Sequence, residues 1–310
     1  MNVTVIGGGL IGTSWAALFL AHGHRVCIHD VAPDVASRVR TELRRIQPFM
    51  RQLGHSLDLE GPGLSFEADL PRAVGQADLV QECGPERLTF KQALWATVEA
   101  HCKPEALLLS SSSGITASMQ SRKMKSSQRM LVGHPFNPPH LVPLVEVVPG
   151  KRTSEDAVRR ARDFYAALGK RPVVLRKEIP GFVANRIQAA VIRESVALVR
   201  QGVVSVEDLD IAVQSSLGLR WATGGPFKSA HLGGGAGGIQ AFFQQFATGL
   251  QLLWLHMRLR PVLLTGRMQQ ALIAQVTQSY GGLSIDELAS IRDQQQIALL
   301  HALQPSTDSE

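Results

Sequence analysis

Residues 3–12 read VTVIGGGLIG, and this stretch decides the fold. Its first four residues are mostly β-branched, which is typical of a short strand buried on both faces of a parallel sheet. Three glycines spaced G-x-G-x-x-G follow at once, and apolar residues at helical spacing come after them. A second apolar run, residues 25–29, ends at Asp30. The stretch therefore predicts a strand, a glycine turn, a helix and a second strand that ends in an acid.

The glycines and the acid fit the binding of a dinucleotide. Gly7 permits the tight turn, Gly9 lets the backbone approach a pyrophosphate, and Gly12 lets the helix pack close to the strand. The helix N-terminus would offer its free N–H groups to the phosphates. Asp30 would accept hydrogen bonds from the adenosine ribose and repel a 2′-phosphate, which favours NAD over NADP. A glycine turn without a ligand is the alternative, but the flanking strands, helix and acid favour binding.

Strand and helix signals alternate up to residue 180, and only helical periodicity follows. The alternation predicts an α/β domain, a Rossmann-like doubly wound sheet that binds NAD, over residues 1–180. Residues 181–310 are expected to form an all-helical domain for substrate binding and dimerisation, with a frayed polar tail over 304–310. Aromatic and aliphatic residues of one long predicted helix support a homodimer, although they also fit an ordinary bundle core. These residues are Phe242, Phe243, Phe246, Leu250, Leu252, Leu253 and Trp254.

Composition narrows the class of protein. A chain of 310 residues with 45% hydrophobic and 19% charged residues is an ordinary globular protein, long enough for two domains. The net charge of +6 suits an anionic ligand, but no nucleic-acid motif accompanies it. Three cysteines without metal-ligand spacing are typical of a reducing compartment. The first apolar run leads straight into glycines and no apolar run is long enough to cross a bilayer, so we expect neither a secretory peptide nor a membrane span. We therefore expect a cytoplasmic protein without a metal, a nucleic-acid partner or a membrane partner.

Polar residues follow the predicted strands at the edge where parallel sheets bind ligands. His134 follows one apolar run, and Glu146 lies inside the next. A neutral imidazole can take the proton of an alcohol, and a carboxylate on its far nitrogen helps it. Ser113, which follows another strand, and Asn185, one turn into the first helix beyond residue 180, could hold the reacting oxygen. We therefore expect these four residues to form a catalytic site.

Each of these residues, taken alone, also fits a simpler role. His134 would be a solvent-exposed loop histidine, Glu146 an edge-strand carboxylate facing water, and the serine run at 110–113 a polar turn. We assign the exposed-loop role to His140 and the turn role to the other three serines. A histidine and a carboxylate on neighbouring strands beside a cofactor motif favour catalysis for the first pair.

Over nearly all its length the chain resembles the 3-hydroxyacyl-CoA dehydrogenase superfamily. The matching segments are VIGGGLIG (5–12), QECGPERLTFK (81–91), SSSSG (110–114), GHPFNPPHLVPLVEVVP (133–149) and EIPGFVANRI (178–187). The serine run, the HPFNPP and PLVEVVP segments and SLGLRWATGGP (216–226) most resemble the λ-crystallin / L-gulonate 3-dehydrogenase branch. The resemblance implies oxidation of the 3-hydroxyl of a small hydroxy acid, such as L-gulonate, by NAD.

The resemblance also implies roles for individual residues. His134 would be the catalytic base, paired with Glu146, and Ser113 and Asn185 would contact the substrate oxygen. The residues that would line the NAD site are Gly7, Gly9, Leu10, Ile11, Gly12, Asp30, Glu86 and Lys91.

Two features bear on whether the substrate is a free acid or an acyl-CoA thioester. The predicted second helix is rich in arginine but lacks the lysine pair of CoA-using relatives, which fits a solvated basic face. The arginines of this helix could also bind the phosphates of CoA. A nucleic acid or an acyl carrier is the least favoured partner for this basic helix. Arg220 would bind a substrate carboxylate in a bidentate pair, or else form a surface or inter-subunit salt bridge. We favour the free acid; an acyl-CoA dehydrogenase and a non-catalytic, crystallin-like NAD-binding protein are the alternatives.

Overall fold

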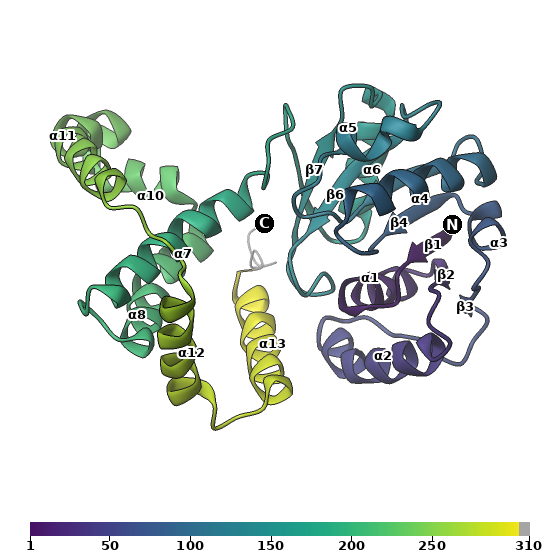
Figure 1. Ribbon diagram of the computed structural model, residues 1–310, viewed down its shortest axis with the longest axis horizontal. Coiled ribbons are helices and arrows are strands. Elements are labelled where there is room, and N and C mark those ends of the chain that lie inside the picture. Colours follow the sequence, from purple (N-terminus) through teal and green to yellow (C-terminus); the bar gives the residue numbers. More distant parts are fainter. Residues whose placement is uncertain (304–310) are drawn as a thin grey trace, which may run out of the picture. The chain divides into compact units, whose positions relative to one another are not determined.

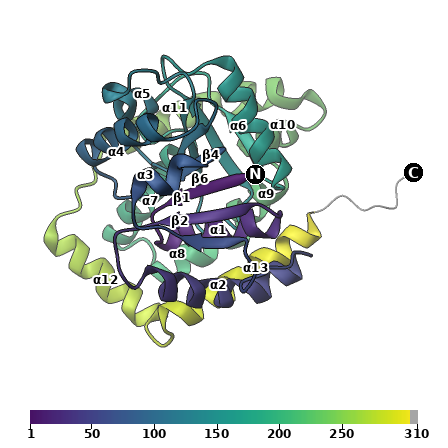
Figure 2. The same cartoon turned by 90° about the vertical axis from the view of Figure 1, so that its right-hand side faces the viewer.

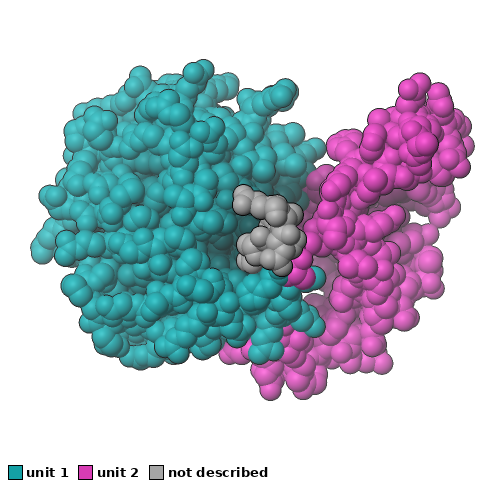
Figure 3. Space-filling view, turned by 180° about the vertical axis from the view of Figure 1, so that it is seen from behind, with its two compact units in different colours: residues 1–186, 292–301 teal, residues 187–291, 302–310 magenta. Residues whose placement is uncertain are grey.

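The computed structural model describes residues 1–303, so the expected frayed tail lies outside the described residues. The chain divides into two compact units (Figure 3). Unit 1 comprises residues 1–186 and 292–301, and unit 2 comprises residues 187–291 and 302–310. Among the described residues, every helix is too short or too polar to span a lipid bilayer.

Unit 1 is built on one sheet of eight strands in the order β3-β2-β1-β4-β5-β6-β7-β8 (Figure 1). Neighbouring strands are parallel, except that β6 and β7 are antiparallel. The strand order reverses at β1, and such a switch point is where open α/β sheets bind their ligands. The strands are β1 (Asn2–Ile6), β2 (Arg25–His29), β3 (Leu64–Phe66), β4 (Leu79–Glu82), β5 (Leu107–Ser110), β6 (Met130–Pro135), β7 (Leu144–Pro149) and β8 (Arg171–Val174).

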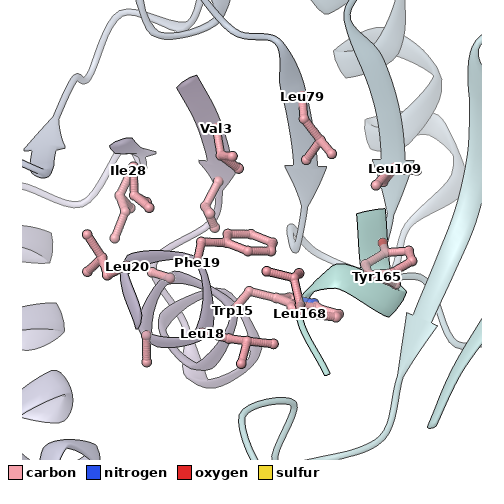
Figure 4. Close-up of a cluster of buried hydrophobic side chains, with 14 of the residues drawn as sticks. Val3, Trp15, Leu18, Phe19, Leu20, Ile28, Leu79, Leu109, Tyr165 and Leu168 are labelled. Atoms are coloured by element: carbon pink, nitrogen blue, oxygen red, sulfur yellow. The ribbon is translucent and has the colours of Figure 1, made fainter. Parts of the chain in front are cut away.

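Helices cover both faces of this sheet. One core cluster holds residues of α1 (Leu10–Ala21), α2 (Val35–Gln52) and α6 (Glu155–Ala167). The other holds residues of α3 (Leu70–Gly75), α4 (Leu88–His101) and α5 (Ala117–Gln120), which the short helix η1 (Ser121–Lys123) follows. Alternate strand residues supply the two clusters, because successive side chains of a strand point to opposite faces. Leu109 of β5 thus packs with Trp15 and Tyr165 (Figure 4), whereas Leu108 packs with Trp95.

Unit 2 is all-helical. Its elements are α7 (Ala184–Arg200, which begins in unit 1), α8 (Val206–Val213), the π-helical η2 (Gln214–Gly218), α9 (Leu219–Thr223), α10 (Pro226–Gly233), η3 (Gly235–Gly237), α11 (Gly238–Leu259), α12 (Gly266–Tyr280) and the start of α13 (Ile285–Ala302), whose residues 292–301 belong to unit 1. Ser205 caps the start of helix α8, because its hydroxyl accepts the N–H of Asp208 at 3.0 Å. The part of α13 that belongs to unit 1 packs Ile297 against Phe49 of α2 and Leu141. Figure 2 shows this last helix beside α2.

The structure confirms the expected fold class, and two local details differ. Strand β3 and helix α3 give no periodic signal in the sequence, because three and six residues are too few to show one. The spacing of Thr153 and Asp156 predicts a capping box for α6, but the cap is Ser154, whose hydroxyl accepts the N–H of Ala157 at 3.1 Å. The Thr153 hydroxyl instead donates to the carbonyl of Met130 at 2.7 Å.

Candidate active site

His134 and Glu146 form a buried pair. The antiparallel register of β6 and β7 sets the two residues directly opposite each other. His134 Nδ1 lies 2.8 Å from Glu146 Oε2, and the two residues are 4% and 1% exposed. The exposed-loop and edge-strand roles considered above are therefore wrong for these side chains. Two phenyl rings border the imidazole, Phe136 at 5.2 Å and Phe182 at 5.4 Å between ring centroids.

The second oxygen of Glu146 holds the start of α7. Oε1 accepts the N–H groups of Val183 and Ala184 at 2.8 and 3.0 Å. Burial raises the pKa of Glu146, but the hydrogen bonds from His134, Ala184 and Val183 more than offset this, so its pKa lies below the ordinary value. The carboxylate is therefore ionised near neutral pH and accepts a hydrogen bond from the N–H at His134 Nδ1. The other ring nitrogen, Nε2, is then left to act as a base.

The structure also brings the other two expected catalytic residues together. Asn185 follows Ala184 in the first turn of α7, and its Nδ2 donates to the carbonyl of Ser113 at 3.1 Å. Ser113 lies on the exposed loop after β5. The first turn of α7 thus joins Glu146, through the N–H of Ala184, to the loop that carries Ser113.

Two residues expected at the NAD site, Lys91 and Glu86, belong to an ion cluster instead of standing free. Lys91 is 1% exposed, and its Nζ donates to Glu82 Oε1 at 2.6 Å and lies 3.4 Å from Glu86 Oε2. Burial raises the pKa of Glu86, but the hydrogen bond from Ser112 and the charge of Lys91 together lower it by more than burial raises it. The pKa of Glu86 therefore lies below its ordinary value. Glu82 was not among the residues expected at the site. The signal that could have found it is a carboxylate at the end of a predicted strand, the edge where parallel sheets bind ligands.

The glycine turn has the shape that a dinucleotide requires. A Cβ on Gly12 would lie 1.9 Å from the carbonyl oxygen of Gly7, so only glycine allows this close packing of α1. A Cβ on Gly9 would meet nothing within 4 Å, and this open space leaves the backbone accessible to a pyrophosphate. Within residues 1–303, no side chain caps the N-terminus of α1, and its first turn lacks an acid. Its N–H groups therefore suit phosphate oxygens.

Asp30 stands at the end of β2 beside this turn. Its Oδ2 accepts the N–H of Gly8 at 2.8 Å, and its Oδ1 accepts the N–H of Ala32 at 3.0 Å. Burial raises the pKa of Asp30, but these two bonds and the charge of Arg38 lower it more, so the net shift is downward. The ionised carboxylate keeps lone pairs for ribose hydroxyls and disfavours a 2′-phosphate, which fits NAD.

A cavity of about 810 Å³ opens beside Asp30. Gly7, Gly9 and Asp30 contribute to its wall, together with the apolar Phe90 and Leu94, so it combines an acid for a ribose with an apolar surface for a base. The other cofactor residues expected from the sequence lie outside this wall, and their contacts with NAD stay predictions. They are Leu10, Ile11, Gly12, Glu86 and Lys91.

The expectation that His140 is an exposed loop histidine is wrong. His140 is 5% exposed, and its Nδ1 lies 2.8 Å from the Ser14 hydroxyl. Burial, with the nearby charge of Lys170, lowers the pKa of His140 to about 3, so the ring stays neutral. Lys170 donates to the carbonyls of Pro139 and Val142 and thereby fastens the loop that follows His134. Burial lowers the pKa of Lys170 to about 7.

Arg220 lies in unit 2, on α9, with an exposed side chain, and its contact with a substrate stays a prediction. Cys27, Cys83 and Cys102 are free. Residues 1–303 contain no group of three or more histidine, cysteine, aspartate or glutamate side chains that could hold a metal ion.

Two alanine variants separate packing from cofactor binding. Gly12→Ala should lower the free energy of unfolding by about 1–3 kcal/mol, because its Cβ meets backbone. Gly9→Ala should leave stability nearly unchanged, since Gly9 has φ −80° and open space around it. We expect it to raise the Kd for NAD about tenfold by blocking the pyrophosphate. Thermal unfolding without NAD and calorimetric titration measure the two effects; equal destabilisation by both variants would contradict the open space at Gly9.

Family models match most of the chain. Residues 2–179 match the NAD-binding domain of 3-hydroxyacyl-CoA dehydrogenase, and residues 181–271 match its C-terminal domain. An L-carnitine dehydrogenase of Nocardiopsis dassonvillei is 40% identical over 98% of this chain and 92% of its own length. A 3-hydroxyacyl-CoA dehydrogenase of Gibberella moniliformis is 44% identical over 79% of this chain and 76% of its own length.

A solved structure covers the whole fold. The NAD+-dependent dismutase 5-formyl-3-hydroxy-2-methylpyridine 4-carboxylic acid 5-dehydrogenase superposes with a TM-score of 0.83 at 28% identity, over 98% of each chain. These findings confirm the expected superfamily and NAD as the cofactor, whereas the λ-crystallin branch stays a prediction. The chain belongs to the 3-hydroxyacyl-CoA dehydrogenase superfamily and is an NAD-dependent oxidoreductase.

Proposed function

We propose that the protein oxidises the 3-hydroxyl group of a small free 3-hydroxy acid to the 3-keto acid, with His134 as general base. The observation that carries this proposal is the buried contact of 2.8 Å between His134 Nδ1 and Glu146 Oε2. It lies where β6 ends, and β6 runs parallel to β5 in the sheet that carries the glycine turn.

Each residue of the site has a task in this reaction. NAD, when bound, accepts the hydride from the carbinol carbon. His134 Nε2 takes the hydroxyl proton, and ionised Glu146 stabilises the imidazolium that results. Ser113 and Asn185 hold the substrate oxygen as its charge changes. The ring of Phe182 keeps water from the imidazole and thereby strengthens its attraction to Glu146.

The relatives bear on the substrate class. L-Carnitine, which names the relative matched over 98% of this chain, is itself a free 3-hydroxy acid. That name supports the free-acid class, and L-gulonate, suggested by the sequence, is a second member of it. The Gibberella moniliformis relative, named for an acyl-CoA substrate, makes 3-hydroxyacyl-CoA oxidation the second candidate. A purely structural NAD-binding protein would have no need of the buried pair of His134 and Glu146.

A substrate panel tests the proposal. L-Gulonate, L-carnitine, 3-hydroxybutyrate and 3-hydroxybutyryl-CoA are each assayed with NAD and with NADP by absorbance of the reduced cofactor. We expect one free acid to exceed the thioester in kcat/KM by about tenfold or more, and NAD to exceed NADP. A thioester that is the best substrate would favour the second candidate. NAD binding without turnover of any compound would indicate a structural protein.

The charge of the substrate is tested in the same panel. Arg220→Met should raise the KM for the best free acid about ten- to hundredfold, because a charge-assisted bidentate pair is lost. Arg267→Met is the matched control, since Arg267 is also an exposed arginine of unit 2 and should leave the KM unchanged. Equal effects of the two variants would remove Arg220 from the proposed substrate contacts.

The base is tested by His134→Gln. This variant should keep the Kd for NAD and lose kcat by a factor of about a hundred to ten thousand, the range of general acid–base catalysis. His101→Gln, at an exposed histidine of α4, is the control and should retain full activity. A kcat for His134→Gln within a few-fold of the parent would exclude His134 as the base.

We also infer that unit 2 pairs with a second copy of the chain. Of residues 187–291, only Val196, Ala197, Val199 and Gly238 are buried. Four consecutive residues of α11, from Leu252 to Leu255, are each more than half exposed although they are Leu, Leu, Trp and Leu. Because consecutive side chains point in different directions, these four residues give this part of α11 an exposed apolar surface, and such a surface indicates a partner.

Light scattering of the full chain should therefore give twice the mass of one chain. Trp254→Glu should shift the mass towards the monomer, because it places a charge in the apolar contact. Arg267→Glu, elsewhere on unit 2, should leave the mass unchanged. A fully active monomer of the parent protein would contradict the inferred pairing.

A further inference from the structure

The cluster of Glu82, Lys91 and Glu86 is more than an isolated ion pair. Lys91 Nζ donates to both oxygens of Glu82, at 2.6 and 2.8 Å, and lies 3.4 Å from Glu86. The side chains of Glu82 and Lys91 are 0% and 1% exposed. A buried charge that loses its water needs both a counter-charge and hydrogen bonds, and this cluster supplies them.

Both carboxylates hold the loop that carries Ser113. Glu82 ends β4, opposite Ser110 at the end of β5, and its Oε2 accepts the Ser110 hydroxyl at 2.6 Å. Glu86 Oε1 accepts the Ser112 hydroxyl at 2.5 Å and the N–H of Gly114 at 3.2 Å. The cluster therefore fastens the loop on each side of Ser113.

The other side-chain bonds to this loop come from neutral groups: the Ser111 hydroxyl accepts Gln81 Nε2 at 2.8 Å, and the Ser113 carbonyl accepts Asn185 Nδ2 at 3.1 Å. Residues 110–114 are four serines and a glycine, so they bring no apolar side chain that could pack into the core. Hydrogen bonds to charged groups are the stronger kind and have defined geometry, which makes them a substitute for packing.

We propose that Glu82 and Lys91 are positioning residues that set the place of Ser113 relative to the substrate oxygen. This proposal rests on the proposed role of Ser113 in binding that oxygen. Lys91 then acts on the reaction through Glu82 and Glu86, since its ammonium is buried between them. Loss of this support displaces Ser113, and a displacement of about 1 Å costs on the order of a hundredfold in rate.

A double-mutant cycle between Glu82→Gln and Ser113→Ala tests the proposal. In the parent protein Glu82→Gln should lower kcat/KM for the best substrate about ten- to hundredfold. In the Ser113→Ala background the same change should have little further effect, because the group that Glu82 positions is gone. The cycle is measured at saturating NAD, so that a change of cofactor affinity through Lys91 or Glu86 does not enter the comparison. An equal factor in both backgrounds would show a merely structural role and overturn the proposal.

Asp78→Asn is the matched control. Asp78 precedes β4, at the other end of the same strand, and forms an ion pair of 2.7 Å with Lys103. Its replacement should affect stability but not kcat/KM in either background. Should Glu82→Gln fail to fold, Ser110→Ala replaces it in the cycle, because it removes the bond to Glu82 and leaves the ion pair with Lys91 intact.

Amide hydrogen exchange supplies a readout that needs no substrate. The N–H of Ser112 donates to the Ser110 hydroxyl, and that of Gly114 donates to Glu86. Glu82→Gln, or Ser110→Ala in its place, should accelerate exchange in residues 110–115, and Asp78→Asn should not. Unchanged exchange would overturn the positioning role. Failure of the proposed function would give a different result. The amides of residues 110–115 in the parent protein would exchange slowly, but the protein would turn over no hydroxy acid.

Discussion

The carboxylate of Glu146 accepts hydrogen bonds on both of its oxygens although its side chain is almost wholly buried. An unpaired charge at this buried place would cost much free energy of folding. The hydrogen-bond partners of the carboxylate therefore have defined positions. One partner is the imidazole of His134, and the other is the first turn of α7. The same group therefore orients the proposed base and sets the start of the helix that carries Asn185. A neutral amide here has one donor and one acceptor and cannot serve both partners as a carboxylate does.

The backbone that leads into α7 is shaped to meet this carboxylate. Gly181 and Phe182 both have positive φ, 74° and 50°, and for a bulky residue such as phenylalanine this conformation is strained. The Phe182 ring is fully buried in the core and lies against His134, and the next two N–H groups bind Glu146. Apolar burial and charge-assisted bonds offset the strain. The strained turn thus places an apolar wall beside the charged pair and keeps the local dielectric low.

Sequence patterns predict those parts of the site that depend on local order. The glycine turn and Asp30 follow a fixed spacing, and His134 and Glu146 lie on neighbouring strands whose register sets them opposite each other. The burial of His140 has no such signal, because its partner Ser14 is distant in the sequence and meets it only in the folded chain. In the sequence, Lys91 is likewise only a helix residue near a cofactor motif. Its bond to Glu82 forms only when α4 packs on the sheet, so the sequence gives no local signal for it. Periodicity reports which face a residue occupies, and tertiary packing decides which charge it meets.

The two loops at this edge of the sheet are both held in place by hydrogen bonds to charged or polar side chains. The serine loop is bound by Glu82 and Glu86, and the loop after His134 is bound by the buried amino group of Lys170 through two carbonyls. These loops must expose polar groups to a substrate, so they cannot be anchored mainly by apolar side chains. Polar and charged side chains replace that packing, because each one demands defined hydrogen bonds and so restricts the backbone that supplies them. Neutral residues of similar volume would be tolerated by the core, but they would no longer dictate where the polar groups of the loops stand.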